Sequence, residues 1–595
     1  MPIKKRWVVR QQGEPRAVAA LAKALAIAPE LAELLIQRGI ETPEKAKNFF
    51  EPSLSSLHDP FLMKGMERAV ERVHQAITNN EKVMVYGDYD VDGTTAVALV
   101  YKFLRQVGHQ RVSYYIPDRY NDGYGISYRG IDHAVAKGVS LIIVLDCGIK
   151  AVDKVLYAKQ RGVEFIICDH HLPGEEIPEA VAVLDPKQSD CQYPFDELSG
   201  CGVGFKLVQA YCLRHEIPFS QIVHLLDLLA VSIASDIVPL VDENRTLAYF
   251  GLERLNNNPS KGLLSIIKIC RLRGERITID DIVFKIGPRI NAGGRMRMDP
   301  DDENAAPSGG FAVVNLLVEG DENAARESGG VIDGFNNDRK EIDRTVTQEA
   351  FDYVENNANL KDSKCTVIYN PKWMKGIVGI VASRLIESYY RPTVVLTKSN
   401  EMVTGSARSI PGFDLYQAIE SCADILENFG GHMYAAGLTM RPERVEEFTK
   451  RFNEYVEQNI DPQILIPQVD IDTEVLFSAI DEKFRKDLHR FQPFGPGNSA
   501  PVFVTREVSN NGNARLVGAA MEHLRMDLVQ GQKPNTRLAA IAFGQPDLYS
   551  WIRSGRPIDV CYSVVENHYR GMVTTQLRIK DMQTIEYKPL NRNHP

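Results

Sequence analysis

The sequence predicts an α/β protein whose largest domain is built on a doubly wound parallel sheet, and three observations lead to this fold class. From about residue 80, short apolar runs alternate with stretches of helical length, which is the order that a parallel sheet requires. The runs are KVMVYG, VSYYIP, LIIVLD and EFIICD. Polar residues follow each run, at the strand ends where ligands bind in such sheets. The length of 595 residues corresponds to about three to four domains in all.

Changes in pattern divide the chain into five parts. Residues 1–70 show the apolar spacing of helices, as in AVAALAKALAIAPELAELLIQRGI. The next parts are the parallel-sheet domain at 71–320, a linker at 321–360 with its helix through about 335–358, a second, smaller α/β domain at 361–460 and a small β-barrel at 461–595. In the second α/β domain, CTVIYN and TVVLT are expected as strands and IVGIVASRLIESYY as a helix. In the barrel, TRLAAIAFG, IDVCYSVVE and GMVTTQLRIKDM are expected as antiparallel strands, with NHYRG as a hairpin turn.

The composition is that of an ordinary globular protein, with 44% hydrophobic and 25% charged residues. Because the net charge is −9, an anionic partner must be held by a local positive surface. Nine cysteines without a CxxC pair favour a reducing cytoplasm over a disulfide framework or a zinc ribbon. No apolar segment follows the basic N-terminus, so no signal peptide is expected. Residues 222–241 contain His224, Asp227 and Asp236, which predicts a buried helix followed by a loop and not a membrane span.

The densest acidic cluster is GDYDVDG at residues 87–93, where Asp88, Asp90 and Asp92 follow a predicted strand. Three carboxylates this close repel one another unless water or cations neutralise them. The pattern also matches the start of a calcium-binding EF-hand loop, but Leu99 stands at the twelfth position, where a glutamate should bind calcium. A solvated turn and a metal site are the two interpretations that the motif itself leaves open.

Three further motifs place polar residues after a predicted strand or a buried helix. They are Asp146 after LIIVL, the triplet Asp169, His170 and His171 after EFIIC, and Asp236 after LLAVSIAS. Each aspartate alone would be interpreted as a helix cap or turn residue, and each histidine as a structural one. Four such sites at one edge of one sheet are better explained by a shared function, and they favour the metal site.

Oxygen ligands with one or two imidazoles suit Mg²⁺ or Mn²⁺, and the imidazole favours Mn²⁺. Zinc would be expected to recruit more histidine or cysteine. Carboxylates from several strands could hold two ions ~3.5–4 Å apart for in-line attack on phosphorus. The chain has no GxxxxGK[ST] motif and no convincing Ser/His/Asp arrangement, so P-loop and acyl-transfer chemistry are not indicated.

The motifs GDYDVDG, VLDCGI, CDHH and SIASDIVPL, in this order, resemble those of the DHH family of phosphoesterases, and most of all its bacterial single-strand-specific 5′→3′ exonucleases. The resemblance continues through GPRINAGGR (287–295), GIVGIVASR (376–384), GSARSI (405–410), GGHMYAAG (430–437) and FGPGNSAPVF. It therefore covers nearly the whole chain. The resemblance implies a two-metal phosphodiesterase domain, a DHH-associated second domain that binds nucleic acid, and an OB-like barrel.

The resemblance also implies roles for individual residues. The expected metal ligands are Asp90, Asp92, Asp146, His170 and Asp236. Asp146 would bridge the two ions, and Asp88 would be a further ligand or the base that orients water. Asp169 would fix the tautomer of a neighbouring imidazole. His171 would face the scissile phosphate, so the predicted catalytic residues are Asp88, Asp146 and His171.

Single-strand binding needs phosphate contacts and aromatic faces on which bases stack. The segment YYIPDRYNDGYGISYRG offers both, and Arg119 and Tyr124 are the residues expected to contact substrate. A solvent loop with packing tyrosines is the alternative interpretation. In PRINAGGR, small residues allow close approach of the backbone to an anion, so Arg289, Asn291 and Arg295 are further candidates.

By the resemblance, a second set of residues would hold the phosphate at the 5′ end of the strand. Arg384 is expected to follow a helix, and Ser406 and Arg408 to lie in a short glycine-containing turn. His432 is expected in a glycine loop, where it would contact a phosphate near the metals or, alternatively, serve as a capping or turn residue. An arginine-lined stop of this kind would measure position from the strand end and so produce an exonuclease.

Four features depart from the family pattern. Tyr86 stands where many relatives have a histidine, so one ion would be held more weakly or completed by water or Asp88. Ala407 replaces a common glycine and would crowd the phosphate loop. The segment around 299–303 is unusually acidic, and the pair Gly329–Gly330 falls near the expected start of the linker helix, where each glycine costs ~1 kcal/mol relative to alanine.

Together these observations predict a metal-dependent 5′→3′ exonuclease that acts on single-stranded DNA in recombination and repair. The expected enzyme is a monomer that works beside a helicase and a single-strand-binding protein, with no membrane association. Two alternatives are a DHH phosphatase acting on pyrophosphate or short oligonucleotides, and a catalytically inert single-strand-binding scaffold. The barrel and the N-terminal helices argue against the first, and the complete ligand set argues against the second. The polarity rests on the resemblance alone, and the sequence does not separate DNA from RNA.

Overall fold

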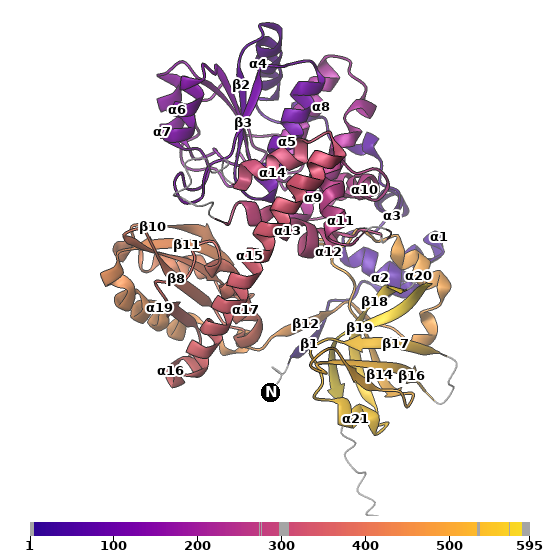
Figure 1. The fold of residues 1–595 in the computed structure, drawn as a ribbon. Coiled ribbons are helices and arrows are strands. Elements are labelled where there is room, and N and C mark those ends of the chain that lie inside the picture. The colour runs from indigo at the N-terminus through magenta and orange to yellow at the C-terminus, as the bar shows by residue number, and fades with distance from the viewer. Residues whose placement is uncertain are drawn as a thin grey trace, which may run out of the picture. The chain divides into compact units, whose positions relative to one another are not determined.

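The structure is a computed structural model that describes residues 5–272, 274, 276–296, 309–531, 536–569 and 572–585. It divides into two compact units (Figure 1). One, here called the sheet unit, comprises Pro52–Glu349 and Pro493–Asn498. The other, here called the barrel unit, comprises Met1–Glu51, Ala350–Gln492 and Ser499–Pro595. The acidic segment 299–303 and the centre of the predicted NHYRG turn lie outside the described residues.

The sheet unit contains five parallel strands in the order β3-β2-β4-β5-β6. They are β2 (Val83–Gly87), β3 (Val112–Tyr115), β4 (Leu141–Leu145), β5 (Glu164–Cys168) and β6 (Ala182–Leu184). The first four are the apolar runs recognised in the sequence, so the predicted doubly wound parallel sheet is confirmed. The fifth, β6, has three residues and was too short to be recognised as a strand.

Helices cover both faces of this sheet (Figure 1). Side chains alternate across each strand, so Val83 and Val85 pack into one core while Met84 and Tyr86 pack into the other. The first core is shared with α4 (Met66–Thr78), α5 (Val91–Gln106), α8 (Gly200–Arg214) and α9 (Leu226–Ser235). The second is shared with α6 (Tyr128–Ala136) and α7 (Val152–Lys159).

Helix α9 lies within the stretch 222–241 and is almost fully buried, as the sequence predicts. It packs against α10 (Asp242–Asn257), where the backbone of Leu226 comes so close to Gly251 that a Cβ there would lie 2.3 Å from the Leu226 carbonyl oxygen. No helix in the described ranges combines the length and the apolar character that crossing a membrane requires.

The PRINAGGR motif forms helix α13 (Gly287–Gly293) after a π-helical turn, Ile282–Ile286. The expectation that its glycines make room for an anion is wrong. A Cβ on Gly294 would lie 2.2 Å from the carbonyl oxygen of Tyr89, and a Cβ on Gly293 would lie 2.6 Å from that of Gly309. These glycines instead let α13 pack against the loop after β2 and against α14 (Gly309–Val318).

The linker helix α15 runs from Glu322 to Glu355 and so begins earlier than residue 335. It continues through Gly329 and Gly330, which the sequence placed near its start. A Cβ on Gly329 would lie 2.2 Å from the Ser265 Oγ atom of α11 (Lys261–Ile269), whereas a Cβ on Gly330 meets nothing within 4 Å. Close helix packing therefore explains the first glycine and leaves the second unexplained.

The barrel unit opens with β1 (Arg6–Val9), a strand in the part expected to be helical, which pairs in parallel with β12 (Gln468–Ile471). Three helices follow, each starting at a proline: α1 (Pro15–Leu25), α2 (Pro29–Gln37) and α3 (Pro43–Phe50). Proline suits the first helical position because its missing N–H would have no partner there.

The second α/β sheet has the strand order β10-β11-β9-β8-β7. Its strands are β7 (Thr366–Tyr369), β8 (Thr393–Ser399), β9 (Met402–Arg408), β10 (Asn428–His432) and β11 (Ala435–Met440), and it carries α17 (Val378–Tyr389) and α19 (Val445–Asn459). Three local expectations are wrong here. GSARSI belongs mostly to β9 and is not a turn, GGHMYAAG is the hairpin β10–β11 and not a loop, and Arg384 lies within α17 and does not follow it.

The C-terminal strands form a closed barrel in the order β14-β18-β19-β17-β16, closed by pairing of β14 with β16. The strands are β14 (Phe503–Asn510), β16 (His523–Gln530), β17 (Arg537–Ala542), β18 (Ile558–Tyr569) and β19 (Met572–Thr584). The closed barrel confirms the predicted OB-like architecture. However, β17 and β19 pair in parallel and not antiparallel, which lets the sheet close on itself.

The glycines of the sheet unit give a test of this packing. We expect Gly330→Ala and Gly334→Ala each to raise the free energy of unfolding by about 0.5–1 kcal/mol, because both lie in open space within α15. We expect Gly251→Ala to lower it by roughly 1–3 kcal/mol, because the new methyl group would meet the backbone of α9. Urea unfolding of the three variants measures this difference. Equal effects at Gly251 and Gly330 would contradict the close α9–α10 contact.

Candidate metal centre

The carboxyl ends of four neighbouring strands carry a row of aspartates. The last residues of these strands are successive pairing partners, namely Gly87, Leu145, Cys168 and Leu184. Each is followed directly by an aspartate, namely Asp88, Asp146, Asp169 and Asp185. All four side chains are buried. The register of the sheet therefore gathers negative charge along one edge. Asp185 belongs to this row of aspartates, but the sequence did not indicate it because β6 is so short.

Asp146 adopts an unusual backbone conformation at this edge. Its φ is 60°, in the left-handed region that favours glycine and, less strongly, asparagine and aspartate. The first residue of α8 presses against it, because a Cβ on Gly200 would lie 2.6 Å from the Asp146 Cβ. The Asp146 Oδ1 atom lies 3.2 Å from His170 Nε2. The turn thus aims the carboxylate across the sheet edge toward the imidazole.

The start of helix α8 holds the carboxylate of Asp92. The backbone N–H of Gly200 donates to Oδ2 at 2.6 Å, and that of Cys201 donates to Oδ1 at 2.8 Å. The Ser232 hydroxyl of α9 donates to Oδ1 at 2.6 Å. A helix N-terminus favours negative charge, so these donors stabilise Asp92 in place. None of the three donors was singled out in the sequence, although Ser199 before two glycines is a helix-start signal.

Asp88 and Asp90 flank the start of helix α5. Asp90 Oδ1 accepts from the Gly93 N–H at 3.0 Å and so caps the helix. Asp88 Oδ1 accepts from the Gly125 N–H at 3.3 Å, while its buried Oδ2 has no hydrogen-bond partner in the described part of the chain. A buried carboxylate oxygen without a partner is costly. It is a position that a cation or a bound water would satisfy.

The two histidines of the DHH triplet have different partners. His170 Nδ1 donates to the Leu198 carbonyl at 2.9 Å, so its Nε2 carries the free lone pair. That Nε2 lies 3.6 Å from Asp236 Oδ2 and 3.8 Å from Asp92 Oδ2. Burial lowers the pKa of His170. His170 is therefore arranged as a neutral ligand that faces the carboxylates.

His171 is held by Asp169. Its Nδ1 lies 2.7 Å from Asp169 Oδ1, and Asp169 also accepts the Ile149 N–H at 2.9 Å. Burial alone would lower the pKa of His171, but the hydrogen bond and the charge of Asp169 raise it. The same contact lowers the pKa of Asp169 against the effect of its burial. The His171 Nε2 atom lies 3.2 Å from the Tyr124 hydroxyl, which points it toward the loop after β3.

The described residues leave negative charge at this edge unbalanced. Burial, and then the neighbouring carboxylates, raise the pKa values of Asp88, Asp90, Asp146 and Asp236. Two groups of side chains place their ligand atoms within 4.8 Å of one another: Asp92, His170 and Asp236, and Asp146, His170 and His171. Oxygen-rich sets with imidazole fit Mn²⁺ or Mg²⁺. The donors, the charge and the unpartnered Asp88 oxygen all fit such ions.

Tyr86 does not reach this set. Its ring is buried on the other face of the sheet, stacked on Tyr115 at 5.2 Å, and its hydroxyl donates to the Gly125 carbonyl at 3.0 Å. The Ser127 N–H donates back to that hydroxyl at 3.2 Å. The phenol thus anchors the loop that carries Tyr124.

The loop after β3 is fastened to α13. Arg119 Nε donates to the Gly294 carbonyl at 2.8 Å, and its guanidinium lies 4.0 Å from the centre of the Tyr89 ring. The Tyr120 hydroxyl donates to the Arg295 carbonyl at 2.9 Å. Tyr124 is 55% exposed beside the metal edge. Arg119, Tyr124 and Arg295 therefore belong to one connected surface of the sheet unit.

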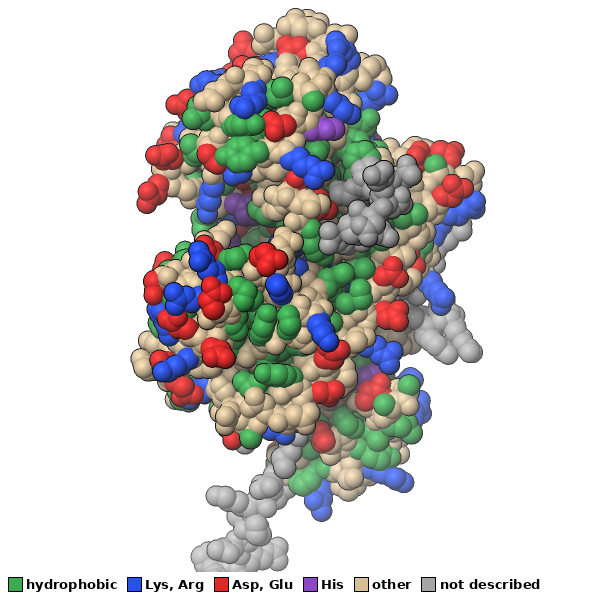
Figure 2. Space-filling view, turned by 60° about the vertical axis from the view of Figure 1, so that its left-hand side comes forward, with side chains coloured by type: hydrophobic (Ala, Val, Ile, Leu, Met, Phe, Trp, Pro, Cys, Tyr) green, Lys and Arg blue, Asp and Glu red, His purple; other side chains and the backbone are tan. Residues whose placement is uncertain are grey.

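Arg289 has partners inside the chain. Its Nε lies 3.0 Å from Asp333 of α15, and its Nη1 donates to the Lys285 carbonyl at 2.9 Å. Asn291 lies two residues further along the same helix, α13. On the face shown in Figure 2, basic and acidic side chains are interspersed.

The barrel unit holds the other predicted substrate residues. Ser406 and Arg408 lie on one side of β9, and Arg408 Nη1 donates to Ser406 Oγ at 3.1 Å. Ala407 points the opposite way, into the core. The expectation that Ala407 crowds this surface is therefore wrong. The start of α17 approaches closely, because a Cβ on Gly379 would lie 2.9 Å from Ser406 Oγ.

The sheet register adds His432 to this set. His432 pairs with Ala435, which in turn pairs with Arg408 across β11 and β9. Arg384 lies on α17, whose first turn adjoins Ser406. The structure therefore brings Ser406, Arg408 and His432 together on one sheet of the barrel unit, while Arg384 lies further along α17 and the other predicted residues lie in the sheet unit.

The charge at the sheet edge gives a pH-dependent test. Because the pKa of Asp146 is raised on folding, the metal-free folded protein loses stability as the pH rises from about 4 through that raised value. We expect Asp146→Asn to be more stable than the parent chain at pH 7.5 without metal, and the gain to vanish near pH 4. Asparagine also tolerates the positive φ.

Urea unfolding with and without Mn²⁺ measures this effect, and Mn²⁺ should stabilise the parent chain and not the variant. Asp153→Asn is the control, because a hydrogen bond from Tyr128 lowers the pKa of that exposed carboxyl and no gain is expected. If the variant is less stable than the parent chain in EDTA at pH 7.5, the negative charge of Asp146 is already neutralised by neighbouring groups of the protein.

Three family models match the chain: the DHH family N-terminal domain over residues 82–233, the DHHA1 domain over 362–458 and the RecJ OB domain over 471–581. Among curated proteins, the single-stranded-DNA-specific exonuclease RecJ of Bacillus subtilis is 36% identical over 98% of this chain and 72% of that protein. RecJ of Escherichia coli is 30% identical over 94% of this chain and 96% of that protein.

Solved structures agree with this. RecJ of Thermus thermophilus in complex with Mn²⁺ has a TM-score of 0.82 at 25% identity and covers 98% of this chain and 80% of that one. An exonuclease RecJ bound to manganese has a TM-score of 0.58 at 27% identity and covers 69% of this chain and 98% of that one. These matches confirm the predicted fold, enzyme class and type of cofactor. The chain belongs to the RecJ family of single-stranded-DNA-specific exonucleases within the DHH phosphoesterases.

Proposed function

We propose that this chain removes nucleotides from the 5′ end of single-stranded DNA by metal-assisted hydrolysis. The observation that carries the proposal is the row of buried strand-end aspartates, in which Asp146 faces His170 Nε2 and whose charge the described residues do not balance. The names of the relatives supply the substrate class, since they are single-stranded-DNA-specific exonucleases. The 5′→3′ polarity is our proposal.

In this proposal each residue of the centre has a defined task. Metal ligands would be Asp90, Asp92, Asp146, His170 and Asp236, and Asp146 would be shared by the two ions. Two Mn²⁺ or Mg²⁺ ions would supply a water of lowered pKa and neutralise charge on the phosphate. Asp88, through its unpartnered Oδ2, would be a further ligand or accept a proton from the attacking water. His171, whose pKa is raised, would donate a hydrogen bond to the scissile phosphate, and Asp169 would fix its orientation.

The substrate contacts would be shared between the two units. In the sheet unit, Arg119, Tyr124, Arg289, Asn291 and Arg295 would line the strand near the metals. In the barrel unit, Arg384, Ser406 and Arg408 would bind the 5′-terminal phosphate, and His432 would contact another phosphate of the strand. Support for Ser406 and Arg408 is their placement beside the start of α17, because helix N-termini favour phosphate. We also propose that the chain comprises five parts, with boundaries near residues 70, 320, 360 and 460.

We also propose a setting for the enzyme. It would act as a monomer in the cytoplasm, in DNA recombination and repair, beside a helicase that supplies single strands and a single-strand-binding protein. All nine cysteines are free, which suits a reducing compartment.

The central test is digestion of single-stranded DNA and RNA labelled at the 5′ or 3′ end, with and without Mn²⁺. We expect stepwise loss from the 5′ end of DNA, and Asp146→Ala should reduce cleavage to background while most strand binding is kept. Asp169→Asn should lower the rate by about 10–100-fold, as loss of an orienting partner does. Near-normal turnover by Asp146→Ala would remove that residue from the centre, and binding without any cleavage by the parent chain would favour an inert scaffold.

A second test addresses the strand end. We expect Arg408→Ala to reduce the preference for a 5′-phosphorylated over a 5′-hydroxyl strand by roughly tenfold or more, since a charge-assisted hydrogen bond to phosphate contributes about 1.5–3 kcal/mol. The measurement is the ratio of kcat/KM for the two strands. Arg444→Ala is the control, because Arg444 is an exposed arginine of the same unit that pairs with Glu447. An unchanged ratio for Arg408→Ala would move phosphate recognition elsewhere.

A further inference from the structure

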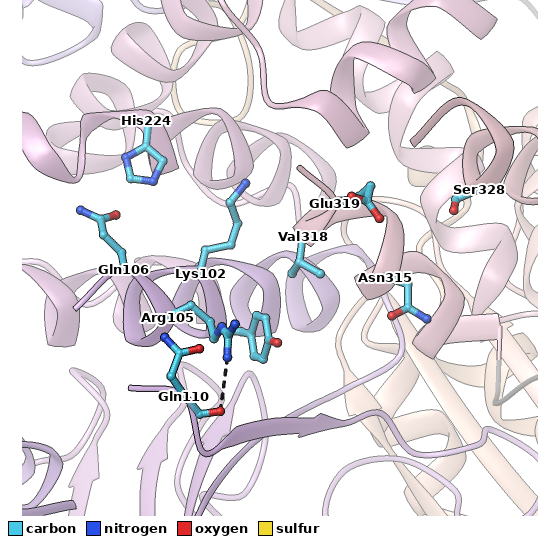
Figure 3. Close-up of a pocket in the computed structure, with 10 residues that line it drawn as sticks. Lys102, Arg105, Gln106, Gln110, His224, Asn315, Val318, Glu319 and Ser328 are labelled. Atoms are coloured by element: carbon cyan, nitrogen blue, oxygen red, sulfur yellow. Dashed lines mark hydrogen bonds between the residues drawn. The ribbon is translucent and has the colours of Figure 1, made fainter. Parts of the chain in front are cut away.

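A groove lies at the other end of the helix whose start carries the metal-ligand candidates. Helix α5 has Asp92 in its first turn, while Lys102, Arg105 and Gln106 in its last turns line the groove (Figure 3). At 1.5 Å per residue, Lys102 lies about 15 Å along the helix axis from Asp92. The groove has a volume of about 750 Å³. Sites for small organic ligands fall in this range.

The two cations of the groove, Lys102 and Arg105, make almost no hydrogen bonds or ion pairs with other described residues. Lys102 Nζ makes no hydrogen bond or ion pair with any described residue, although its side chain is largely covered and burial lowers its pKa. The carboxylate of Asp227 acts on it from a distance, but both Asp227 oxygens are engaged by the N–H groups of Leu228 and Ser260. Arg105 uses Nη1 for the Gln110 carbonyl at 3.3 Å and is otherwise exposed. Two cations therefore face the groove, and the carboxylate that also lines it, Glu319, already accepts from the N–H groups of Gly320 and Asp321.

A neutral histidine stands opposite these cations. His224 extends toward the same space as Lys102 and Gln106 from a separate helical turn, Val223–Leu225 (Figure 3). Burial, and then the charge of Lys102, lower the pKa of His224, so its imidazole can donate one hydrogen bond and accept another. The helix dipole favours cations at the end of α5. The dipole does not explain why the covered side chain of Lys102 points toward the same space as His224, which belongs to a different helical turn.

The other lining groups suit a base and a sugar. Tyr101 presents an aromatic ring, set edge-on to Tyr114 at 5.2 Å. The Tyr114 hydroxyl donates to Asn315 Oδ1, which leaves the Asn315 amide N–H groups available to a ligand. The Gln106 amide donates to the Gln221 carbonyl at 3.0 Å, which leaves its oxygen as an acceptor. Glu319, on the α14 side, can accept from a sugar hydroxyl.

We propose that this groove binds a nucleoside 5′-monophosphate, with the phosphate held by Lys102 and Arg105 and the base against Tyr101. Two cations match the charge of a phosphate monoester, and the amides on either side match the donors and acceptors of a base. The inference stands on the groove alone and does not depend on the proposed exonuclease activity, although such an activity would produce this class of ligand.

The experiment is isothermal titration of the full chain in EDTA, in a background that carries Asp146→Asn and Arg408→Ala. These two substitutions are chosen to weaken phosphate binding at the metal centre and at the proposed strand-end site. If no nucleotide binding is detected in this background, the proposed exonuclease activity is not contradicted. The ligands are deoxyadenosine monophosphate, deoxyadenosine and inorganic phosphate. We expect one saturable site for the nucleotide, at least roughly tenfold tighter than either of the other two, since both halves of the ligand are recognised.

Lys102→Gln and Arg105→Gln, added singly, should each weaken binding of the nucleotide by about tenfold or more. Lys159→Gln is the matched control, because Lys159 pairs with Glu179 on the exposed surface of α7 and should leave the affinity unchanged. Thermal unfolding checks that the variants are folded, and Arg105 is exposed enough that its replacement disturbs no core. Absence of nucleotide binding, equal binding of phosphate alone, or an affinity that neither variant changes would each overturn the proposal.

Discussion

Like charges crowded at one edge of a buried sheet are the constraint around which the sheet unit is built. The register puts Asp88, Asp146, Asp169 and Asp185 side by side, and a low-dielectric surrounding strengthens their repulsion. Backbone N–H groups answer part of this charge: the start of α8 at Asp92, the start of α5 at Asp90, and the loop N–H of Gly125 at Asp88. This packing requires glycine, because a Cβ on Gly93 would meet the backbone of Asp88 and a Cβ on Gly200 would meet the side chain of Asp146. Divalent cations would balance the negative charge that these hydrogen bonds do not neutralise.

The same edge shows how adjacent identical residues acquire opposite roles. His170 donates from Nδ1 to a neutral carbonyl, whereas His171 faces the carboxylate of Asp169. A carbonyl fixes a tautomer without favouring an added proton, and a carboxylate favours the imidazolium. Burial lowers the pKa of His170, whereas the hydrogen bond and charge of Asp169 raise the pKa of His171 against the effect of burial. Two neighbouring positions in the sequence thus provide a neutral nitrogen for a metal and a proton for a phosphate.

Sequence patterns located the main strands and the strand-end aspartates because those strands are long, apolar and followed by polar residues. They failed where local signals conflicted with distant packing. Glycines at 405 and 431 suggested turns, but they lie in strands, where a Cβ would meet Leu396 or Ala436. The strand β1 could not be recognised from its neighbours, because its partner β12 lies more than four hundred residues away. Asp185 follows only three strand residues, so its place in the row depends on pairing with β5, which no local pattern contains.

A chain with a net charge of −9 can hold a polyanion only through cations whose positions are fixed in advance. Three of the arginines expected to touch substrate meet this requirement. Arg119 is tied to the Gly294 carbonyl and the Tyr89 ring, Arg289 to Asp333, and Arg408 to Ser406. A guanidinium has five N–H donors in a rigid fork, so one or two internal bonds orient it and still leave donors for a phosphate. Because little side-chain entropy is then lost on binding, internal partners strengthen the case for these arginines as substrate contacts.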